Sequence, residues 1–512
     1  MASSAHPDIP SEERDNAVTA PSVSELNCNL IPFAHLCGLL NKCERIEGPG
    51  ATERKLDLVF SEDLVQRLRG DSVFPLLRLL LPAVDTERGR YGLKAISAAK
   101  LYVQALNLSQ DSVDAQRLLH WEDPRKSLVR VADFGSVLED VLHSRVSNEF
   151  STITIGEVNG LLDAIAKASG KEKEQVIRNR MVMRFSPNEQ KWVMRIIFQD
   201  LKVGLKKDNI LRRLSPTAIE RFNECTSLRT VCEEVLYSNR IPSGIRLFNI
   251  YSPMLALGDP KAKTGQIRFA ESSMRGHPFV MDIKLDGERM SCHIQHSDIH
   301  KVAFYTRNGN DYTSKYQKLA DDLMLAVSDY NCIIDGEVLA YSAETNDAIA
   351  FGANRSVGIA ERDNPNFDTL NSWMTFVAFD LLYLEGIGAV DLINSVIVDY
   401  NSNFLMTFQP SADEVLTANP VASDGSLLNL PLQIRRQLLE RILGTQENRI
   451  EIVKHEIVLN TALNERLEKI ENFYHLNSMA GEEGLVVKVL NASNIISYGK
   501  DVRISHLPTS WA

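Results

Sequence analysis

The stretch Lys284-Leu285-Asp286-Gly287-Glu288-Arg289 decides how this chain is interpreted. A lysine stands at the end of the β-type run FVMDIK, and an Asp-Gly turn follows it directly. The K-x-D-G pattern is weak by itself, because ordinary surface hairpins often produce it. Its value depends on the motifs that accompany it along the chain.

Further motifs follow this lysine in order. They are Arg307-Asn308-Gly309, Asp335-Gly336-Glu337 after an apolar run, Phe379-Asp380-Leu381-Leu382 inside a strand-like run, and Glu483-Gly484-Leu485-Val486-Val487-Lys488. Each motif alone has an ordinary structural explanation, and Asp335-Gly336 could be no more than a hairpin turn. The ordered set has no comparable structural explanation, so it indicates a functional site.

The set resembles the covalent nucleotidyltransferase superfamily, which comprises ATP-dependent DNA ligases, RNA ligases and mRNA capping enzymes. The segment Pro253-Met254-Leu255-Ala256, ahead of the lysine, resembles the entry segment of DNA ligases. The helical half resembles the DNA-binding domain of eukaryotic end-joining ligases in the runs YGLKAISAAKLY, EVNGLLDAIA and EQKWVMRIIFQDLKVGL. The resemblance covers residues 30–386 and 427–490.

The resemblance implies a reaction in two displacements at phosphorus. Lys284 would attack the α-phosphate of ATP, release pyrophosphate and hold AMP as a phosphoramidate. The AMP would then move to a DNA 5′-phosphate, and the neighbouring 3′-hydroxyl would displace it to seal the strand. Positioning and charge neutralisation supply most of the catalysis in such reactions.

The resemblance also implies a nucleotide pocket around this lysine. Its members are Leu285 beside the nucleophile, Phe379 stacked on adenine, Asp282 accepting from the adenine amino group, Arg289, Arg307 and Lys488 on phosphate or ribose, and Glu337 and Glu483 on ribose or Mg²⁺. Mg²⁺ prefers oxygen ligands and usually bridges phosphates. Relatives often have glutamate at the position of Asp282, so this chain departs there from the family.

The hydrophobic pattern predicts a multidomain protein. Residues 1–24 are predicted to be a disordered tail. From 25 to 240, apolar residues recur at three- and four-residue spacings, which predicts an all-α domain, DNA-binding by the resemblance. From 241 to 512, short β-rich runs with helical stretches at 315–328 and 432–443 predict an α+β, mainly antiparallel nucleotidyltransferase domain.

The charge pattern favours a DNA contact in the helical half. The formal net charge is −11, yet residues 171–213 hold twelve Lys and Arg against five Asp and Glu. Lys202, Lys206 and Lys207 surround Gly204, where close backbone approach suits DNA phosphates. A solvated helix face explains the charge about equally well. The preceding helix is predicted to begin at Ser186-Pro187 and to carry Lys191 and Arg195 away from its apolar side.

Two departures from the family lead to further expectations. Pro431 lies 45 residues after Gly386 (431 − 386), so residues 388–424 are predicted to be a disordered, dispensable insertion. Only 24 residues follow Lys488 (512 − 488), and they contain no K-x-K strand. We therefore expect a fragment without the OB-fold and the C-terminal domains that bind a coiled-coil scaffold, and a poor ligase.

Three functions stay open at this point: a DNA ligase, another nucleotidyltransferase, and a non-enzymatic DNA-binding product. The first implies nicked or broken duplex DNA as partner, ATP and Mg²⁺ as ligands, and a nuclear location. No apolar run reaches the roughly 20 residues of a membrane helix, and the N-terminus has no apolar signal core. Seven scattered cysteines without zinc-type spacing indicate reduced thiols.

Overall fold

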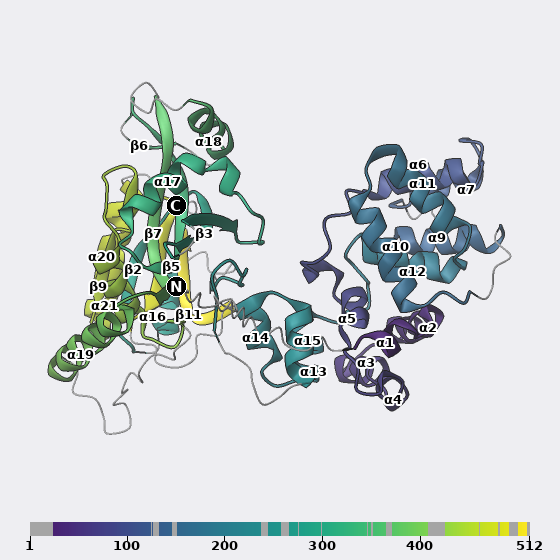
Figure 1. Ribbon diagram of the computed structural model, residues 1–512, viewed down its shortest axis with the longest axis horizontal. Coiled ribbons are helices and arrows are strands. Elements are labelled where there is room, and N and C mark those ends of the chain that lie inside the picture. Colours follow the sequence, from purple (N-terminus) through teal and green to yellow (C-terminus); the bar gives the residue numbers. More distant parts are fainter. Residues whose placement is uncertain are drawn as a thin grey trace, which may run out of the picture. The chain divides into compact units, whose positions relative to one another are not determined.

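The protein is described here from a computed structural model, in which the chain forms two compact units (Figure 1). The described residues are 24–123, 125, 133–145, 151–236, 244–257, 266–274, 276–297, 300–345, 347–349, 352–364, 371–407, 425–459, 461–479, 482–490 and 500–508. One unit comprises residues 1–213 and 228–239, and the other comprises 214–227 and 240–512. All but the last residue of the predicted N-terminal tail lies outside the described residues.

The first unit is all-α, as its apolar spacing predicts. Its helices are α1 (Leu26–Asn29), α2 (Phe33–Glu44), α3 (Ala51–Val59), α4 (Glu62–Leu68), α5 (Phe74–Leu80), η1 (Pro82–Val84), α6 (Ala95–Ala105), α7 (Val113–Leu119), α9 (Phe134–His143), α10 (Ile155–Lys167), α11 (Gly170–Val176), the π-helix η2 (Ile177–Val182), α12 (Pro187–Ile197), α13 (Lys207–Leu214) and α15 (Leu228–Leu236).

Helix α12 begins as predicted but is buried on more sides than predicted. The Ser186 hydroxyl accepts from the Glu189 amide, and the Glu189 carboxylate accepts from the Ser186 amide, which completes a capping box. Trp192 is fully buried, and Lys191 and Arg195 are buried as well. The expectation that these two cations lie on an outer face is therefore wrong.

Acidic partners from neighbouring helices explain this burial. The Lys191 Nζ atom lies 2.9 Å from Glu44, and Arg195 lies 2.6 Å from Glu44 and 2.7 Å from Asp133. Buried charges are tolerated when they are paired and hydrogen-bonded. These two cations, counted in the basic segment from the sequence, thus stabilise the interior and are not available to DNA.

The second unit holds two sheets and a helical layer. Its strands are β1 (Leu255–Leu257), β2 (Phe279–Lys284), β3 (Glu288–Gln295), β4 (Lys301–Thr306), β5 (Asn331–Ser342), β6 (Asp347–Ala348), β7 (Ser372–Glu385), β8 (Ile450–Ile452), β9 (His455–Val458), β10 (Gly484–Val489) and β11 (Lys500–Pro508). Its helices are α14 (Ala218–Cys225), α16 (Gln266–Ser273), η3 (Thr313–Lys315), α17 (Gln317–Ala326), α18 (Asn354–Asp363), α19 (Ala389–Thr407), α20 (Leu432–Ile442) and α21 (Leu463–Met479).

The strand pairing confirms the predicted α+β, mainly antiparallel class. One sheet has the order β1-β11-β10-β2-β9, and the other has the order β4-β3-β5-β7-β8 with β6 on β5. Among the described strands, β1–β11 and β7–β8 pair in parallel and the other pairs are antiparallel. The helical stretches predicted at 315–328 and 432–443 correspond to α17 and α20.

Strand alternation separates a core face from a site face in each sheet. In β3, Met290 and Cys292 join the large core under α17 to α20, while Arg289 takes the opposite face. In β2, Met281 packs in a second core with residues of α16 and α21, which leaves Lys284 on the other face. The apolar faces of both sheets are therefore covered by helices, and the polar residues on the opposite faces can contribute to a site.

Two bulges interrupt this alternation in β7. Asp335 pairs with Asp380 but Gly336 pairs with Ala378, so Phe379 is an extra residue without a partner on β5. Leu382 is a second extra residue, between the partners of Ile333 and Ile334. A bulge re-aims the side chains next to it. Phe379 and Asp380 both lie outside the large core as a result.

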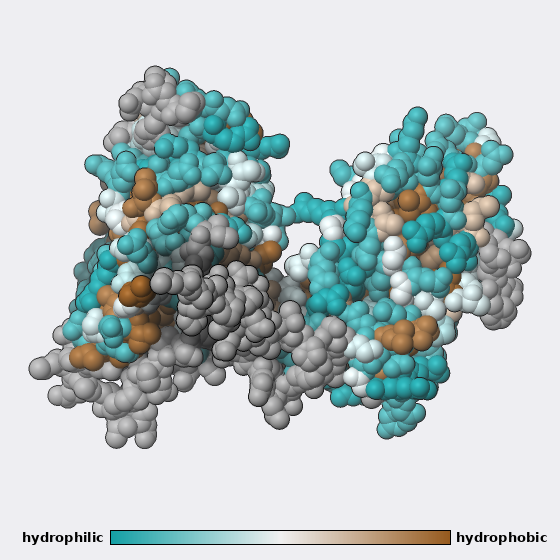
Figure 2. All heavy atoms as spheres, in the orientation of Figure 1, coloured by the Kyte–Doolittle hydropathy of each residue, from teal (hydrophilic) through white to brown (hydrophobic). Residues whose placement is uncertain are grey.

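The predicted disorder of residues 388–424 is wrong for its first half. Residues 389–407 form helix α19, and Ile393, Val396, Ile397 and Tyr400 are buried in the large core with α20. Their spacing of three and four residues is that of an amphipathic helix. The outer side of α19 exposes apolar residues too, and brown atoms mark this end of the unit in Figure 2. Residues 408–424 lie outside the described residues.

Two other expectations need correction. A strand does follow β10, because β11 pairs with it antiparallel from Gly484 to Lys488, although its sequence KDVRISHLP contains no K-x-K. The boundary between the units is also not a single cut at 240. Helix α14 belongs to the second unit, because the Asn223 carbonyl accepts from the Ser252 amide and the Thr226 hydroxyl donates to the Ile250 carbonyl.

All seven cysteines are free and buried. In the described part of the chain, no helix is long and apolar enough to cross a membrane.

Candidate nucleotide site

Lys284 ends β2 at the edge of the site face. Its register partner on β10 is Gly484, and its ammonium group forms an ion pair with the Glu483 carboxylate just before that glycine. About a quarter of the Lys284 side chain is exposed, at 26 %. The two predicted residues are thus in direct contact, and the amine is accessible to a substrate.

Asp282 lies two residues earlier on the same face and is buried between two cations. Its Oδ2 atom lies 2.5 Å from the Arg436 guanidinium and 2.8 Å from the Lys488 Nζ atom. Burial alone would raise the pKa of this carboxyl, but the charges of Arg436 and Lys488 outweigh burial and lower the pKa to about 2. Asp282 is therefore a carboxylate, which can only accept hydrogen bonds.

Phe379 provides an aromatic surface in the same region. The Lys488 Nζ atom lies 4.4 Å from its ring centroid, and the centre of the Arg289 guanidinium lies 5.2 Å from it. Leu285 packs with Phe379 against a small apolar cluster of Leu339, Val377 and Val453. A flat base can stack on such a ring, and the cations beside it suit the phosphates and sugar attached to the base.

Arg289 is fixed by a two-pronged ion pair. Its Nε and Nη2 atoms lie 3.0 and 2.6 Å from the two oxygens of Asp335 on β5. Its Nη1 atom donates to the Met254 carbonyl at 2.6 Å. Met254 belongs to the predicted entry segment. The motifs at 253–256, 284–289 and 335–337 therefore meet through one guanidinium.

Glu337 lies beside Arg289, because the two residues are register partners on β5 and β3. Burial raises the pKa of its carboxyl to about 8, against the opposing attraction of Arg289 and Lys284. Glu337 and Glu483 are the two oxygen donors that the resemblance assigns to Mg²⁺. The described residues contain no cluster of three or more potential metal ligands. Two carboxylates nevertheless fit Mg²⁺, which usually keeps waters and bridges phosphates.

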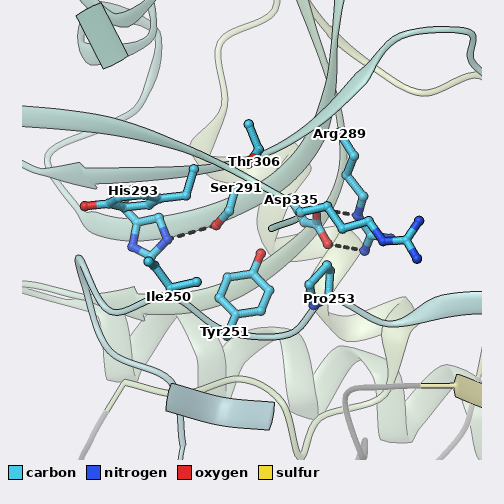
Figure 3. Close-up of a pocket in the computed structure, with 10 residues that line it drawn as sticks. Ile250, Tyr251, Pro253, Arg289, Ser291, His293, Thr306 and Asp335 are labelled. Atoms are coloured by element: carbon cyan, nitrogen blue, oxygen red, sulfur yellow. Dashed lines mark hydrogen bonds and ion pairs between the residues drawn. The ribbon is translucent and has the colours of Figure 1, made fainter. Parts of the chain in front are cut away.

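A pocket opens beside the ion pair of Arg289 with Asp335 (Figure 3). Arg289, Asp335, Arg307, Thr306, Ser291, His293, Tyr305, Ile250, Tyr251 and Pro253 line it. The Phe248 amide donates to the His293 Nδ1 atom at 2.9 Å, and Nε2 lies 2.9 Å from the Ser291 hydroxyl. Burial lowers the pKa of His293 to about 3. His293 is thus neutral, and Nε2 donates to Ser291.

All the predicted nucleotide residues therefore gather in the second unit. Arg307 is exposed and lines the pocket next to Arg289. Arg436, Asp335 and Asp380 were not among the predicted site residues. Their signal in the sequence is weak, since Arg-Arg on a helix and Asp in a strand or turn have ordinary structural explanations.

The predicted DNA contacts belong to the first unit. Lys202 and Lys206 are exposed, and Lys207 is half-buried at the start of α13. Lys202 has a positive φ of 58° and its ammonium pairs with Asp200, while Gly204 has φ of 71°.

Comparison with known proteins identifies relatives of both units. A family model for the DNA ligase N terminus matches residues 32–215, and one for the ATP dependent DNA ligase domain matches residues 253–507. DNA ligase 4 of Coprinopsis cinerea is 33 % identical over 387 residues, covering 71 % of this chain and 36 % of the relative. DNA ligase 4 of Homo sapiens is 32 % identical over 353 residues, covering 64 % and 37 %.

A third relative extends over more of the chain. DNA ligase 4 of Dictyostelium discoideum is 27 % identical over 516 residues, covering 92 % of this chain and 42 % of the relative. The chain thus spans little more than a third of the length of the curated relatives that it matches.

Proposed function

Because this chain belongs to the family of ATP-dependent DNA ligases, we propose that it adenylates itself on Lys284 and passes the AMP to broken DNA. The observation that carries the proposal is the position of Lys284. Its partly exposed amine contacts Glu483, within a site that also contains Phe379 and several fixed cations.

The first step is a displacement at the α-phosphorus of ATP. The Lys284 ammonium group first loses one proton; its nitrogen then forms a bond to this phosphorus while the bond to the pyrophosphate oxygen breaks, and the nitrogen releases a second proton to solvent. Glu483 touches the ammonium group and is placed to accept the first of these protons. The amine then carries AMP through a P–N bond. An aligned nucleophile supplies much of the rate in such a step.

The pocket residues orient the nucleotide for this attack. Adenine stacks on Phe379 and donates from its amino group to Asp282, as the resemblance implies. Arg289 and Arg307 hold ribose or phosphate oxygens as fixed donors. Lys488 neutralises charge near the base and ribose. Because Asp335 holds Arg289 in a fixed orientation, little rearrangement is needed when the nucleotide binds.

Glu337 and Glu483 are the residues that would hold Mg²⁺. The ion, when bound, would neutralise phosphate oxygens and favour departure of pyrophosphate. Since the Glu337 pKa is about 8, its carboxyl releases a proton before it can act as an anionic ligand at neutral pH. As an alternative, the protonated carboxyl can donate to a ribose oxygen.

The helical unit would bind duplex DNA through phosphates, with Lys202, Lys206 and Lys207 as contacts. The relatives carry the name DNA ligase 4, and on this basis we place the chain in nuclear repair of double-strand breaks by end joining. A coiled-coil scaffold partner belongs to the same proposal for the whole protein.

Incubation with α-labelled ATP and Mg²⁺, followed by a denaturing gel, tests the adenylation step. The wild-type chain should acquire covalent label, and Lys284→Ala should acquire none. Lys318→Ala, which removes a lysine of α17 paired with Asp322 at 3.2 Å, serves as the matched control. Label that persists in Lys284→Ala, or label in neither chain, would show that the proposed nucleophile is wrong.

A further inference from the structure

Helix α20 carries two neighbouring arginines that reach opposite sides of the nucleotide site. Arg435 extends to Asp380 on β7, next to Phe379. Arg436 extends to Asp282 on β2, two residues before Lys284. Both guanidiniums are almost completely buried, at 2 % and 5 % exposure. The helix thus contacts one strand of each sheet through a charged pair.

The two arginines differ in how well their hydrogen-bonding groups are satisfied. Arg435 donates from Nε and Nη2 to the two oxygens of Asp380 at 2.8 Å, and from Nη1 to the Leu430 carbonyl at 2.6 Å. Arg436 makes one bond, from Nη2 to Asp282. Its Nε and Nη1 atoms are buried and find no acceptor among the described residues.

This difference argues against a purely stabilising role for Arg436. A buried donor without a partner costs about 1–3 kcal/mol, and more on a charged group. A buried ion pair is often no more stable than an apolar replacement. Arg435 is well satisfied and explains the attachment of α20 to β7. Arg436 lies at a buried position where the described residues satisfy only one of its donors.

The Asp282 carboxylate shows what Arg436 achieves. Arg436 and Lys488 both bind Oδ2, while Oδ1 is buried and has no donor among the described residues. A carboxylate oxygen is an acceptor only. Adenine presents an amino donor at C6, whereas guanine presents a carbonyl acceptor there. A fixed, ionised oxygen therefore favours adenine and repels guanine.

We propose that Arg436 is a positioning residue for nucleotide selectivity, holding the Asp282 carboxylate so that Oδ1 alone is free for the amino group of adenine. The inference rests on the proposed function, since it assumes that the base lies between Phe379 and Asp282. It adds a residue from α20, outside the nucleotide motifs, to the selection of ATP over GTP.

The test is direct binding of ATP and of GTP to the full chain by calorimetry. Arg436→Met should reduce the ratio of the two dissociation constants by about 10- to 100-fold, the range expected for one hydrogen bond to a charged group. Arg441→Met, on the same helix and at an exposed pair with Asp399, is the matched control. It should leave the ratio within a factor of about three, because Arg441 contacts α19 and not Asp282.

A second variant distinguishes positioning from loss of structure. Asp282→Asn can present either a carbonyl or an amide to the base, so it should lower the ratio by itself. In that background Arg436→Met should cause little further change, because two residues acting through one interaction are not additive. Independent, additive losses would overturn the inference, as would an unchanged ratio in a folded Arg436→Met chain or a wild-type chain without preference for ATP.

The two proposals fail in different ways. A wild-type chain that binds ATP selectively but acquires no label on Lys284 contradicts the adenylation proposal alone. Covalent labelling of Lys284 by GTP as readily as by ATP contradicts the selectivity proposal alone.

Discussion

Helix α19 provides the sharpest test of how this domain is assembled. Ile393 is 1 % exposed and packs in the large core, whereas Val398 on the same helix is 62 % exposed. Replacing each by alanine removes apolar atoms from the same helix, in one case from the core and in the other from the surface. If α19 is an integral part of the unit, only the first replacement should be costly.

The magnitude follows from burial. Truncation of a buried isoleucine to alanine costs about 2–5 kcal/mol, because transfer and cavity terms add. A surface substitution usually changes stability by less than about 0.5 kcal/mol. Each kcal/mol of destabilisation lowers the melting temperature of a large domain by about 2–4 °C. We therefore expect Ile393→Ala to lower the melting temperature of the second unit by roughly 4–20 °C and Val398→Ala to leave it nearly unchanged.

The assay must report on the second unit separately from the first. Urea titration followed by hydrogen-exchange mass spectrometry does so, with peptides from β5 and α20 as reporters. The free energy of unfolding of those peptides should fall in Ile393→Ala. Equal and small changes in both variants would refute the packing argument. They would also restore the expectation that residues 388–407 can be removed without loss.

Three further predictions concern other parts of the chain. The pKa of Glu337 is about 8, raised from 4.5, so the folded chain holds a proton that the unfolded chain releases. The free energy of unfolding should therefore fall as the pH rises from about 4.5 to 8. Urea titrations should show that Glu337→Gln removes this dependence on pH. Arg195→Met should destabilise the first unit by about 3–5 kcal/mol, because Asp133 stays buried without its cation, while Arg184→Met, at an exposed pair, should cost less than about 1 kcal/mol in the same denaturation assay. Reversing the charges of Lys206 and Lys207 should weaken duplex binding and reduce its salt dependence by about one to two units of slope, without regard to base sequence; an unchanged slope would contradict a phosphate contact.

Short motifs allowed the site to be predicted because they lie on strands that pair with each other. The motif at Lys284 and the motif at Glu483 become neighbours through the pairing of β2 with β10, and Arg289 meets Glu337 through β3 with β5. Charged and aromatic residues inside strands and at strand ends have few structural roles, so these residues indicated the site. The motifs and their order along the chain could therefore be recognised without knowledge of the fold.

Residues that act through long-range contacts were not predictable in this way. Arg436 and Asp282 are 154 positions apart, and no local pattern links them. The same holds for Lys191 and Arg195, whose acidic partners come from other helices. In α19, the buried residues follow the helical spacing of three and four, but Val390 and Val398 are apolar on the exposed side, so the sequence shows no clean amphipathic pattern.

The paired bulges of β7 have a consequence for deletions. Between the two bulges, the residue of β7 that faces the core is Leu381, which has an odd number. On either side, the residues that face the core are Ala378 and Leu384, which have even numbers. Each bulge shifts this phase by one residue, so that core residues of β7 stay opposite core residues of β5, and the two together restore the original phase. Deletion of Phe379 or Leu382 would therefore remove one bulge and leave the other pairs of β7 with β5 in place. In a scan of single-residue deletions, the fold should tolerate loss of these two extra residues better than loss of a paired core residue of this fourteen-residue strand.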